Sequence, residues 1–417
     1  MSQRALGAGF GGLWTATAGT ALGAQVTGIA LPLLAVLTLH ASPFQAGMLA
    51  TAQWLPFLVV ALPLGVVVDR MRRRPLLVVA EAGRAVVLLV IALLAAAGVL
   101  GFPPLLLLAV LLGCCSVLFE VGVQSYLPSV VRLDRLDAAN SRMQGTEAVA
   151  LVAGPGIGGL LVQAVGAAGA LGVQVVTSIV SLSAVLSIRR QEALPVGVHA
   201  RFLPSLREGL AFLAHDRILL GLVGFSAIYN PFEQWISVLF TIDAVRRLHL
   251  SAGQLGVVLA IGALGALAGA LAAPVVSRRA GALVATLWCA VVESVVLLLL
   301  PLPEASWGRA GIIALAGGVL AVNNAATALS SVVLLTVRQR RIPDPLRGRV
   351  NAASRAVSYG SVAVGALLGG IAGQVLGVRG GLTLGCFGVL LTVVWTLGWG
   401  LPLLRRGVRI DAVVLHG

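Results

Sequence analysis

The densest run of charge in the chain separates two long apolar segments, and it limits the possible folds more than any other stretch. Gly65–Pro75 reads Gly-Val-Val-Val-Asp-Arg-Met-Arg-Arg-Arg-Pro, with all of its charges between Asp69 and Arg74. Charged side chains are costly within hydrocarbon, so this stretch must be a short turn outside it. Short loops rich in arginine stay on the cytoplasmic side of a membrane. The turn therefore predicts a membrane protein and orients the helices on either side.

The composition agrees with a chain that lies within a membrane along most of its length. Of the 417 residues, 59% are hydrophobic and 11% are charged, and the mean hydropathy is +1.01. A spanning helix needs about 20 apolar residues, so roughly twelve spans fit with short connections. No stretch is left for a soluble catalytic domain. We expect an all-α polytopic membrane protein with twelve transmembrane helices.

The apolar stretches predict these spans in two groups of six, separated by one long polar stretch. We therefore expect an N-terminal half at 1–188, a cytoplasmic linker at 189–217, a C-terminal half at 218–404 and a cytoplasmic tail at 405–417. The expected spans cover residues 9–38, 44–67, 76–98, 104–126, 141–164, 169–188, 218–243, 252–276, 282–302, 309–336, 352–376 and 381–404.

The linker has the pattern of a helix that lies on a membrane surface. Leucines recur within it at helical spacing, and charged or polar side chains lie on the opposite side. This pattern is typical of an amphipathic helix, here on the cytoplasmic face. The leucines are Leu203, Leu206, Leu210 and Leu213, and the opposite side carries Arg207, Glu208 and His215.

The distribution of arginines favours one orientation. With a cytoplasmic N-terminus, only Arg246, Arg247, Arg309 and Arg379 fall in outer connections. The inner connections and the tail take most of the remaining basic residues. Because basic residues concentrate in cytoplasmic loops, we expect both termini in the cytoplasm.

The composition argues against several other classes of protein. A net charge of +14 would indicate nucleic-acid binding in a soluble protein, but here all 29 basic residues are arginine and most lie in alternate loops. A chain without lysine cannot form the Walker A loop of an ATP-driven pump. Because Cys114, Cys115, Cys289 and Cys386 lie in apolar runs, we expect no disulfide, metal or other cofactor. The N-terminus enters a long span without a cleavage site, which indicates a retained first helix.

The two halves repeat one another in sequence. Asn140, Gly158 and Gly159 match Asn351, Gly369 and Gly370 at one constant offset of 211 residues, and Gly154 and Gly166 match Gly365 and Gly377 at the same offset. The fifth helix therefore corresponds to the eleventh. We expect two six-helix halves in parallel repeat.

The turn and the repeat resemble those of the major facilitator superfamily of transporters. The spacing Gly65-x-x-x-Asp69-Arg70-x-x-Arg73-Arg is similar to that family's signature between its second and third helices, with Arg72 at a position that is usually glycine. Further segments resemble the drug and siderophore exporter branch, which includes enterobactin exporters and macrolide efflux proteins. These segments are Tyr126–Val131 with Ala138–Asn140, Gly154–Gly159, and Val337–Asn351 with Gly369 and Gly370.

The resemblance implies a secondary transporter of the bacterial cytoplasmic membrane. Such a protein would export a hydrophobic or amphipathic small molecule, such as a drug, an antibiotic or a siderophore, by proton antiport with alternating access. Its partners would be that molecule, protons and the lipid bilayer, without nucleic acid, and we expect it to act as a monomer.

The resemblance also places helices one, four, seven and ten around the substrate cavity. Glu120 and Glu233 fall on two of these helices, and Pro231 loosens the backbone near Glu233. A carboxyl group removed from water takes up a proton more readily, so both glutamates are candidates for proton coupling. Glu293 has a similar depth on a helix expected to be peripheral. Candidates for the cavity lining are Gln25, Phe119, Asn230, Phe232, Trp235, Asn323 and Asn324.

A group of charges near the cytoplasmic ends of the helices is a candidate for an inner gate. Glu81 and Arg84 are three residues apart, so they share a helix face and can pair. A fixed structural network is the alternative for the same residues. The candidate gate comprises Gly65, Asp69, Arg70, Arg73, Glu81, Arg84 and Glu147.

The fifth helix carries Gly154, Pro155, Gly158 and Gly159, which resemble part of the antiporter motif of proton-coupled exporters. Ala150 and Ser141 stand where that motif has further glycines. Small residues let helix backbones approach closely in a membrane. These residues provide either static packing or an interface that moves during transport.

Two other classes of function remain as alternatives. One is a facilitator or proton symporter that imports a small nutrient, although the spans have few of the polar and aromatic residues that a sugar site needs. The other is a membrane sensor or a membrane-embedded enzyme. An enzyme of that kind needs His, Asp or Cys side chains one helical turn apart, and no such pair is visible in a span.

Overall fold

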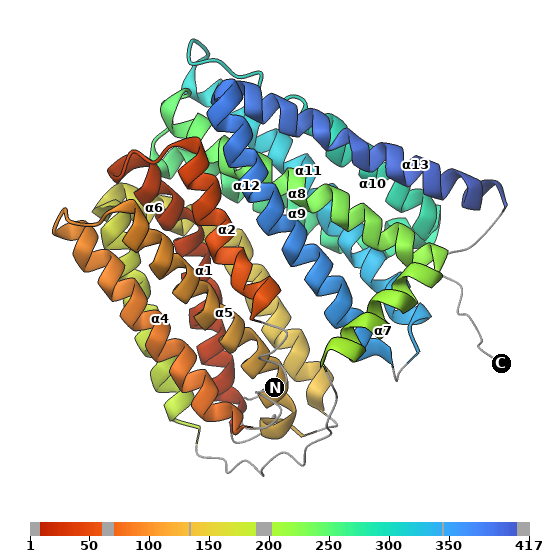
Figure 1. The fold of residues 1–417 in the computed structure, drawn as a ribbon, viewed down its shortest axis with the longest axis horizontal. Helices are drawn as coiled ribbons and strands as arrows, with labels where there is room; N and C mark the ends of the chain where they lie inside the picture. The colour runs from red at the N-terminus through yellow and green to blue at the C-terminus, as the bar shows by residue number, and fades with distance from the viewer. Residues whose placement is uncertain (1–8, 61–70, 133–134, 189–201, 344–345, 407–417) are drawn as a thin grey trace. The chain divides into compact units, whose positions relative to one another are not determined.

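The computed structural model describes residues 9–60, 71–132, 135–188, 202–343 and 346–406, which form helices joined by short connections (Figure 1). It divides into two compact units. Unit 1 comprises Met1–Ala200 with Ser251–Gly256, and unit 2 comprises Arg201–Leu250 with Val257–Gly417. The all-α fold predicted from composition is confirmed.

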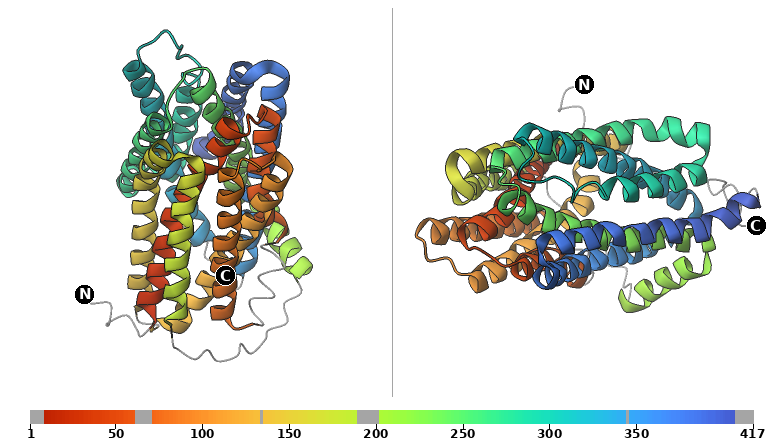
Figure 2. Two further views of the ribbon diagram at one scale, coloured as in Figure 1. Left: turned by 90° about the vertical axis from the view of Figure 1, so that its left-hand side faces the viewer. Right: turned by 90° about the horizontal axis from the view of Figure 1, so that it is seen from above.

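Unit 1 consists of long helices that lie side by side (Figure 1, Figure 2). Helix α6 packs against α1 and α4, and α5 packs against α4 and α2. In chain order, the elements are α1 (Phe10–Leu33), the π-helical turn η2 (Leu34–Thr38), α2 (Pro43–Val59), α4 (Arg73–Ala96), α5 (Phe102–Val130) and α6 (Leu136–Leu186).

Unit 2 follows the same plan after one additional short helix. Helix α8 packs against α12 and α13, and α10 packs against α11 and α13. Its elements are α7 (Phe202–His215), α8 (Arg217–Arg246), α9 (Ala252–Ala280, which begins in the stretch that clusters with unit 1), α10 (Ala282–Leu297), α11 (Arg309–Arg341), α12 (Arg347–Gly388) and α13 (Leu390–Arg405).

Two of these helices each correspond to more than one expected span. Helix α6 runs through Gly166, where φ is 75° and ψ is 168°, and α12 runs through Gly377, where φ is 75° and ψ is 161°. A positive φ is strained for residues with a Cβ, so glycine lets the chain turn sharply without a loop. The expected connection at 165–168 is thus a glycine kink. Each kink divides its helix into two segments, and α13 continues the second segment of α12. Counted in this way, the described part of each half has six helical segments.

These kinks confirm the parallel repeat, because Gly166 and Gly377 match at the offset found in the sequence. Seven of the described helices are individually long and apolar enough to cross a membrane. The α6 helix has 51 residues and the run from Gly348 to Arg405 has 58, so each is long enough for two spans. The described parts of α2 and α10 are shorter, with 17 and 16 residues.

The structure also contains a second repeated element that the sequence comparison missed. His40 and His249 are the described non-glycine residues with positive φ, at 50° and 53°. Each precedes a capping box: Ser42 N–H donates to Gln45 Oε1 at 2.8 Å, and Ser251 N–H donates to Gln254 Oε1 at 2.9 Å. The reciprocal bonds from the glutamine N–H to the serine Oγ are 3.2 Å in both. The common pattern Leu-His-x-Ser-x-x-Gln-x-Gly is visible at 39–47 and 248–256.

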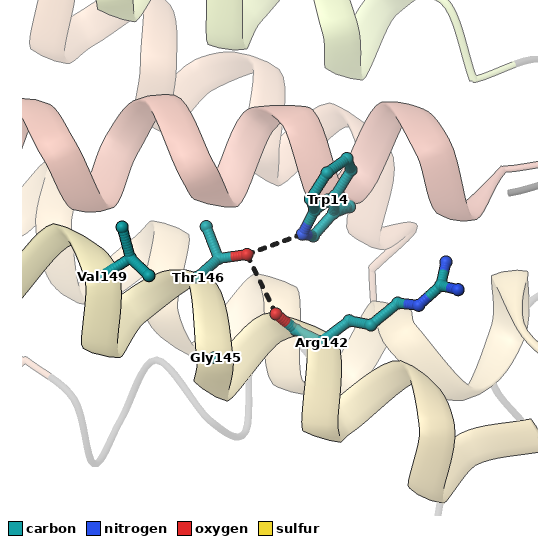
Figure 3. Close-up of a pocket in the computed structure, with 5 residues that line it drawn as sticks. All are labelled: Trp14, Arg142, Gly145, Thr146 and Val149. Carbon is teal, nitrogen blue, oxygen red and sulfur yellow. Dashed lines mark hydrogen bonds between the residues drawn. The ribbon is translucent and has the colours of Figure 1, made fainter. Parts of the chain in front are cut away.

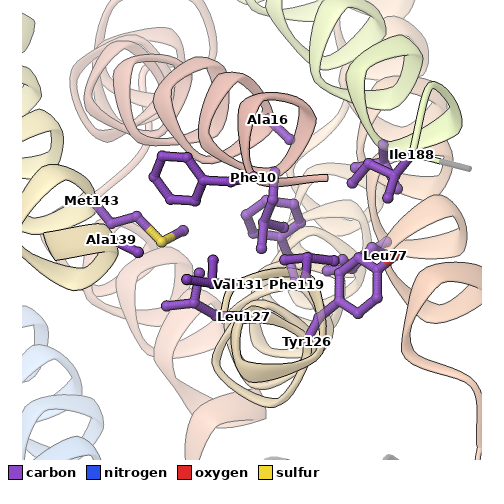
Figure 4. Packing of buried hydrophobic residues seen from close by; sticks show 14 residues of the cluster. Phe10, Ala16, Leu77, Phe119, Tyr126, Leu127, Val131, Ala139, Met143 and Ile188 are labelled. Carbon is purple, nitrogen blue, oxygen red and sulfur yellow. The ribbon is translucent and has the colours of Figure 1, made fainter. Parts of the chain in front are cut away.

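The inner core of unit 1 is apolar and involves four helices (Figure 4). Phe10 of α1, Leu77 of α4, Tyr126 of α5 and Met143 of α6 are each no more than 5% exposed. Phe119 belongs to the same cluster. Its ring lies 5.3 Å from the guanidinium carbon of Arg84. The predicted cavity residue Phe119 is therefore positioned by core packing.

The expected amphipathic helix of the linker is present as α7, and it packs against α12. The side chain of Leu213 in α7 is buried, and Glu208 accepts hydrogen bonds of 2.7 Å from Arg349 of α12. The chain then bends by 109° into α8. Asp216 stabilises the corner by accepting bonds from the first N–H groups of α8 and from Arg341 at 3.0 Å.

Some expected boundaries differ from those observed. The described part of α2 ends at Val59, and residues 61–67 of that expected span lie outside the described residues. The expected span 381–404 is divided at Val389 between α12 and α13. Helices α5 and α11 extend past their expected inner ends to Val130 and Arg341.

Candidate functional site

Unit 2 contains a cavity of about 150 Å³ between α8, α11 and α12. Along α11 the lining residues recur every three or four positions from Thr327 to Arg338, so they share one helix face. Eleven residues of helix extend about 16 Å. Apolar side chains form one part of the wall: Leu222, Val223, Phe225, Leu334 and Leu335. Polar side chains form the rest: Ser226, Tyr229, Asn230, Thr327, Ser330, Ser331, Arg338, Ser354 and Ser358.

A buried hydrogen-bond network adjoins one end of this cavity. The Tyr229 hydroxyl accepts a bond from Asn323 Nδ2 at 3.0 Å and lies 2.9 Å from Thr327 Oγ1. Asn323 Nδ2 also donates to the backbone carbonyl of Glu293 at 3.2 Å. Asn323 is 3% exposed. The network therefore joins α8, α10 and α11 behind the cavity wall.

Glu293 of α10 ends this network in the interior of unit 2. Its side chain is fully buried, and its Oε1 accepts a bond of 2.8 Å from Ser330 Oγ. Its Oε2 has no hydrogen-bond partner among the described residues. Because Ser330 also lines the cavity, one hydroxyl connects a buried carboxyl group to that space. The sequence analysis expected Glu293 on a peripheral helix and did not predict this connection to a cavity.

The predicted residues Asn230 and Glu233 share one face of α8, because they are three positions apart. Asn230 lines the cavity, and the side chain of Glu233 is exposed on unit 2. Tyr229 interacts electrostatically with both Glu233 and Glu293. Tyr229 is therefore close enough to interact with a buried carboxyl group and with an exposed one.

The other cavity candidates in unit 2 take different positions. Trp235 is buried, and its indole N–H donates to the carbonyl of Gly381 at 2.9 Å. Phe232 packs against Gly388, and its ring centroid is 5.9 Å from that of Trp235. Asn324 faces Gly262 of α9, because consecutive helix residues point about 100° apart and its neighbour Asn323 faces α8.

In unit 1, the structure confirms that Glu81 and Arg84 pair. Arg84 Nη1 donates to Glu81 Oε1 at 2.7 Å, and the two side chains are 0% and 5% exposed. Thr20 Oγ1 of α1 donates to the same oxygen at 3.0 Å. Arg84 also lies over the ring of Phe119. The pair thus ties α1, α4 and α5 together within unit 1, and its part in a gate stays a prediction.

Glu120 and Glu147 lie near one another at a different position in unit 1. Glu120 of α5 is half-buried and accepts a bond of 3.4 Å from Gln124, whereas Glu147 of α6 is exposed. The two carboxyl groups interact electrostatically. Their roles in proton coupling and in the gate stay predictions.

Unit 1 has a second hollow of about 370 Å³, lined by Trp14, Arg142, Gly145, Thr146 and Val149 (Figure 3). The Trp14 indole N–H donates to Thr146 Oγ1 at 2.8 Å, and Thr146 Oγ1 donates to the Arg142 carbonyl at 2.9 Å. The Trp14 indole, the Thr146 hydroxyl and the Arg142 carbonyl are thus bonded to one another, and the Arg142 guanidinium points away from them (Figure 3). This hollow therefore offers a ligand fewer hydrogen-bonding groups than the cavity of unit 2.

Most of the charged turn at the start of α4 lies outside the described residues, including Gly65, Asp69 and Arg70. Arg73 begins α4, and its Nε is buried without a hydrogen-bond partner among the residues described. The next residue, Arg74, donates to the carbonyl of Leu186 at 2.6 Å at the end of α6. The base of the turn is thereby attached to α6.

The glycines of the fifth helix lie where α6 contacts α1. A Cβ on Gly154 would overlap the side chain of Gln25, and a Cβ on Gly158 would lie 3.3 Å from Val26 Cα. Gly159 packs against Gly256, in the short stretch that clusters with unit 1. Pro155 lies within the same helix. Gln25 therefore contributes to helix packing.

The equivalent glycines of unit 2 make the equivalent contact between α12 and α8. A Cβ on Gly365 would overlap the backbone of Pro231, and a Cβ on Gly369 would lie 2.8 Å from Trp235 Cα. Each unit is thus held together by a glycine-lined contact between its first and fifth helices. Among the described residues, no three His, Cys, Asp or Glu side chains come together as a metal site would require.

Comparison with known proteins identifies the fold and related sequences. The model of the family described as Major Facilitator Superfamily matches residues 13–365. The multidrug efflux pump Tap of Mycolicibacterium fortuitum is 29% identical over 370 residues, which cover 85% of this chain and 86% of that protein. Tap of Mycobacterium tuberculosis (strain ATCC 25618 / H37Rv) is 28% identical over 371 residues, which cover 85% of this chain and 84% of that protein.

Two solved structures are similar over nearly the whole chain. A bacterial homologue of the iron transporter ferroportin, in its inward-facing state, has a TM-score of 0.73 at 16% identity, with 96% of this chain and 100% of that chain covered. The nucleoside transporter NupG has a TM-score of 0.71 at 12% identity, with 93% and 97% covered. At these identities the likeness shows a common fold.

Proposed function

The chain belongs to the major facilitator superfamily, and on that premise we propose that it exports a hydrophobic or amphipathic small molecule from a bacterial cell in exchange for protons. It is a multi-pass membrane transporter by family, and not an enzyme. The direction of transport, the coupling to protons and the cytoplasmic position of both termini belong to the proposal.

The mixed lining of the cavity in unit 2 is the observation that carries the proposal. Leu222, Phe225 and Leu334 provide apolar contact area, and serine, threonine and tyrosine hydroxyls provide hydrogen-bonding groups beside it. Sites for small amphipathic ligands have this combination of an apolar wall with a few placed polar groups. The names of the relatives, which are multidrug efflux pumps, support export of such a molecule.

Three carboxyl groups are candidates for carrying the proton. Glu233 and Glu120 remain the predicted pair, and Glu293 joins them because of its position behind the cavity. A carboxyl group without a cationic partner is favoured in its neutral form when it is desolvated, and water that reaches it favours release of the proton. Opening and closing of the cavity would therefore change how readily Glu293 binds a proton.

The glycine contacts support transport by alternating access. Because α1 meets α6 and α8 meets α12 at glycine-lined contacts, each unit is closely packed within itself. Units of this kind move as bodies when access alternates between the two sides of a membrane. The charged turn around Asp69 would latch the cytoplasmic side in one of the two states.

Accumulation in cells tests export most simply. Cells that express the protein should retain less of at least one lipophilic compound than cells that express the Glu233→Gln variant at equal membrane level. The panel should include neutral, cationic and acidic dyes, so that each class of charge is tested. If no compound of a broad panel is depleted, export fails and uptake of a small nutrient becomes the better proposal.

A further inference from the structure

Two donor groups that line the cavity, Arg338 Nε and Ser354 Oγ, have no hydrogen-bond partner in the part of the chain that the structure describes. Arg338 Nε is buried without a hydrogen-bond partner among the described residues. Ser354 Oγ of α12 is also unpartnered there, and its side chain is only 3% exposed. An unsatisfied buried polar group costs free energy that a ligand can recover by accepting its hydrogen bond. Both residues line the cavity, so a hydrogen-bond acceptor bound there would lie close to both donor groups.

The charge on the described side chains that line this cavity is positive. Arg338 is the one charged side chain among the described residues that line the space. A second guanidinium, that of Arg355, acts on Arg338 electrostatically. The guanidinium fork is also well suited to a carboxylate, which can accept two of its hydrogen bonds.

Apolar side chains lie directly next to the basic end. Leu334 and Leu335 precede Arg338 by one helical turn on the same face of α11, and Leu222 faces them from α8. A ligand that fills the cavity therefore meets a cation at one end and hydrocarbon beside it. This arrangement suits an organic acid with an apolar body better than a free inorganic anion.

We propose that this cavity binds the carboxylate of a small amphipathic acid, with Arg338 pairing with the acid group, Ser354 donating a hydrogen bond to it and the leucines holding its apolar part. This proposal assigns a substrate class to the exporter proposed above. Only the statement that the bound acid is also transported rests on that proposed function. The binding itself requires neither a proton gradient nor transport.

Binding of a compact aromatic acid and its neutral amide tests the site. Equilibrium dialysis of the purified full-length protein would compare naphthoate with naphthamide. Arg338→Gln should weaken naphthoate binding about tenfold or more, because a charge-assisted hydrogen bond is lost, and should change naphthamide binding less than about twofold. Ser354→Ala should weaken naphthoate binding about threefold.

Arg340→Gln is the matched control. It removes the same charge from the same helix, but Arg340 is exposed and does not line the cavity. Naphthoate binding by this variant should stay within about twofold of the unaltered protein, since exposed charges are screened at physiological salt. The proposed site would be contradicted if Arg338→Gln and Arg340→Gln weakened naphthoate binding equally. It would also be contradicted if Arg338→Gln weakened naphthoate and naphthamide binding equally.

A second variant keeps the test decisive if Arg338→Gln does not fold. Ser358→Asp places a carboxylate in the cavity while Arg338 is retained. It should reduce naphthoate binding about tenfold or more and leave naphthamide binding nearly unchanged. Unchanged naphthoate binding by Ser358→Asp would contradict the proposal.

A competition experiment in lipid vesicles distinguishes a small acid from a lipid headgroup as the occupant of the site. In phosphatidylcholine vesicles, adding phosphatidylglycerol should not displace naphthoate, because the occupant is a small acid. Competition by phosphatidylglycerol that disappears in Arg338→Gln would give the site to a lipid headgroup and overturn the substrate assignment.

Failure of this site and failure of export are distinguishable. If dyes are exported while Arg338→Gln binds naphthoate as the unaltered protein does, the acid site is wrong and export stands. If naphthoate binding depends on Arg338 while no compound is exported, export is wrong and the acid site stands.

Discussion

Ser330 Oγ donates a hydrogen bond of 2.8 Å to Glu293 Oε1, and the same serine lines the cavity between α8, α11 and α12. A single hydroxyl therefore joins a fully buried carboxyl group to a space that a ligand can occupy. The second carboxyl oxygen has no hydrogen-bond partner in the described part of the chain. A proton that binds there would be sensitive to what fills the cavity.

Glu293→Gln should abolish coupling to protons while leaving the fold intact. The amide oxygen still accepts the Ser330 bond, and the amide cannot bind or release a proton near neutral pH. We expect at least a tenfold fall in transport driven by a pH gradient, measured as dye uptake into vesicles. Glu304→Gln is the control, since Glu304 is exposed and contacts Arg379 at 3.4 Å. Equal transport by the two variants would remove Glu293 from the mechanism.

Glu81→Ala should destabilise unit 1 strongly. It would leave Arg84 buried without its partner, and breaking one side of a buried ion pair costs about 3–5 kcal/mol. Breaking the exposed pair with Glu208→Gln should cost less than about 1 kcal/mol. Thermal unfolding in detergent measures both.

Replacing Glu81 and Arg84 together by Leu and Met separates a structural role from a gate. The double variant removes both buried charges, so it should be more stable than Glu81→Ala. If the double variant unfolds at a higher temperature than Glu81→Ala and still transports, the pair is structural. Recovered stability without transport would support the gate.

Gly365→Ala should destabilise the protein more than Gly154→Ala. The added Cβ meets three backbone atoms of Pro231 in the first case. In the second it meets Cβ and Cγ of Gln25, of which only Cγ can turn away. We expect a cost of about 1–3 kcal/mol for overpacking at either site, with Gly365 at the upper end. Gly145→Ala is the control on α6, because no atom lies within 4 Å of its Cβ position. A cost for Gly145→Ala as large as the other two would contradict the packing account.

Asp216→Ala should loosen the corner between α7 and α8. Asp216 accepts the N–H groups of Ile218 and Leu219 at 2.8 and 3.1 Å and also binds Arg341. Losing the cap costs about 1 kcal/mol, and Asp216→Asn should retain most of it. Hydrogen exchange of α7 should rise in the alanine variant and much less in the asparagine variant. Equal exchange in both variants would show that the cap does not stabilise the corner.

The sequence predicted those features that depend on order along one helix. The three-residue spacing of Glu81 and Arg84 placed them on one face, and the structure pairs them at 2.7 Å. The glycine offset of 211 predicted the correspondence of the two kinked helices. The leucine spacing predicted α7. In each case the relevant neighbours lie within one helix or within one repeat, so no knowledge of helix packing was required.

Contacts between distant helices could not be predicted in the same way. Tyr229, Thr327 and Ser330 meet because particular faces of α8 and α11 are turned toward one another, and the spacing within either helix does not contain that information. Glu293 was assigned to the periphery for the same reason. The matching Leu-His-x-Ser-x-x-Gln-x-Gly segments were available in the sequence, and comparison at an offset of 209 would have found them.

Proton-driven uptake into inside-out membrane vesicles tests the central claim most directly. The lumen of such vesicles corresponds to the outside of the cell, so an exporter should concentrate a lipophilic dye there when the lumen is acidified. We expect uptake by the unaltered protein, its loss when nigericin collapses the gradient, and its loss in Glu233→Gln and Glu120→Gln at equal protein level. Gradient-dependent uptake that is undiminished in both variants would contradict the assigned proton sites, and uptake no greater than in vesicles without the protein would contradict proton-coupled export itself.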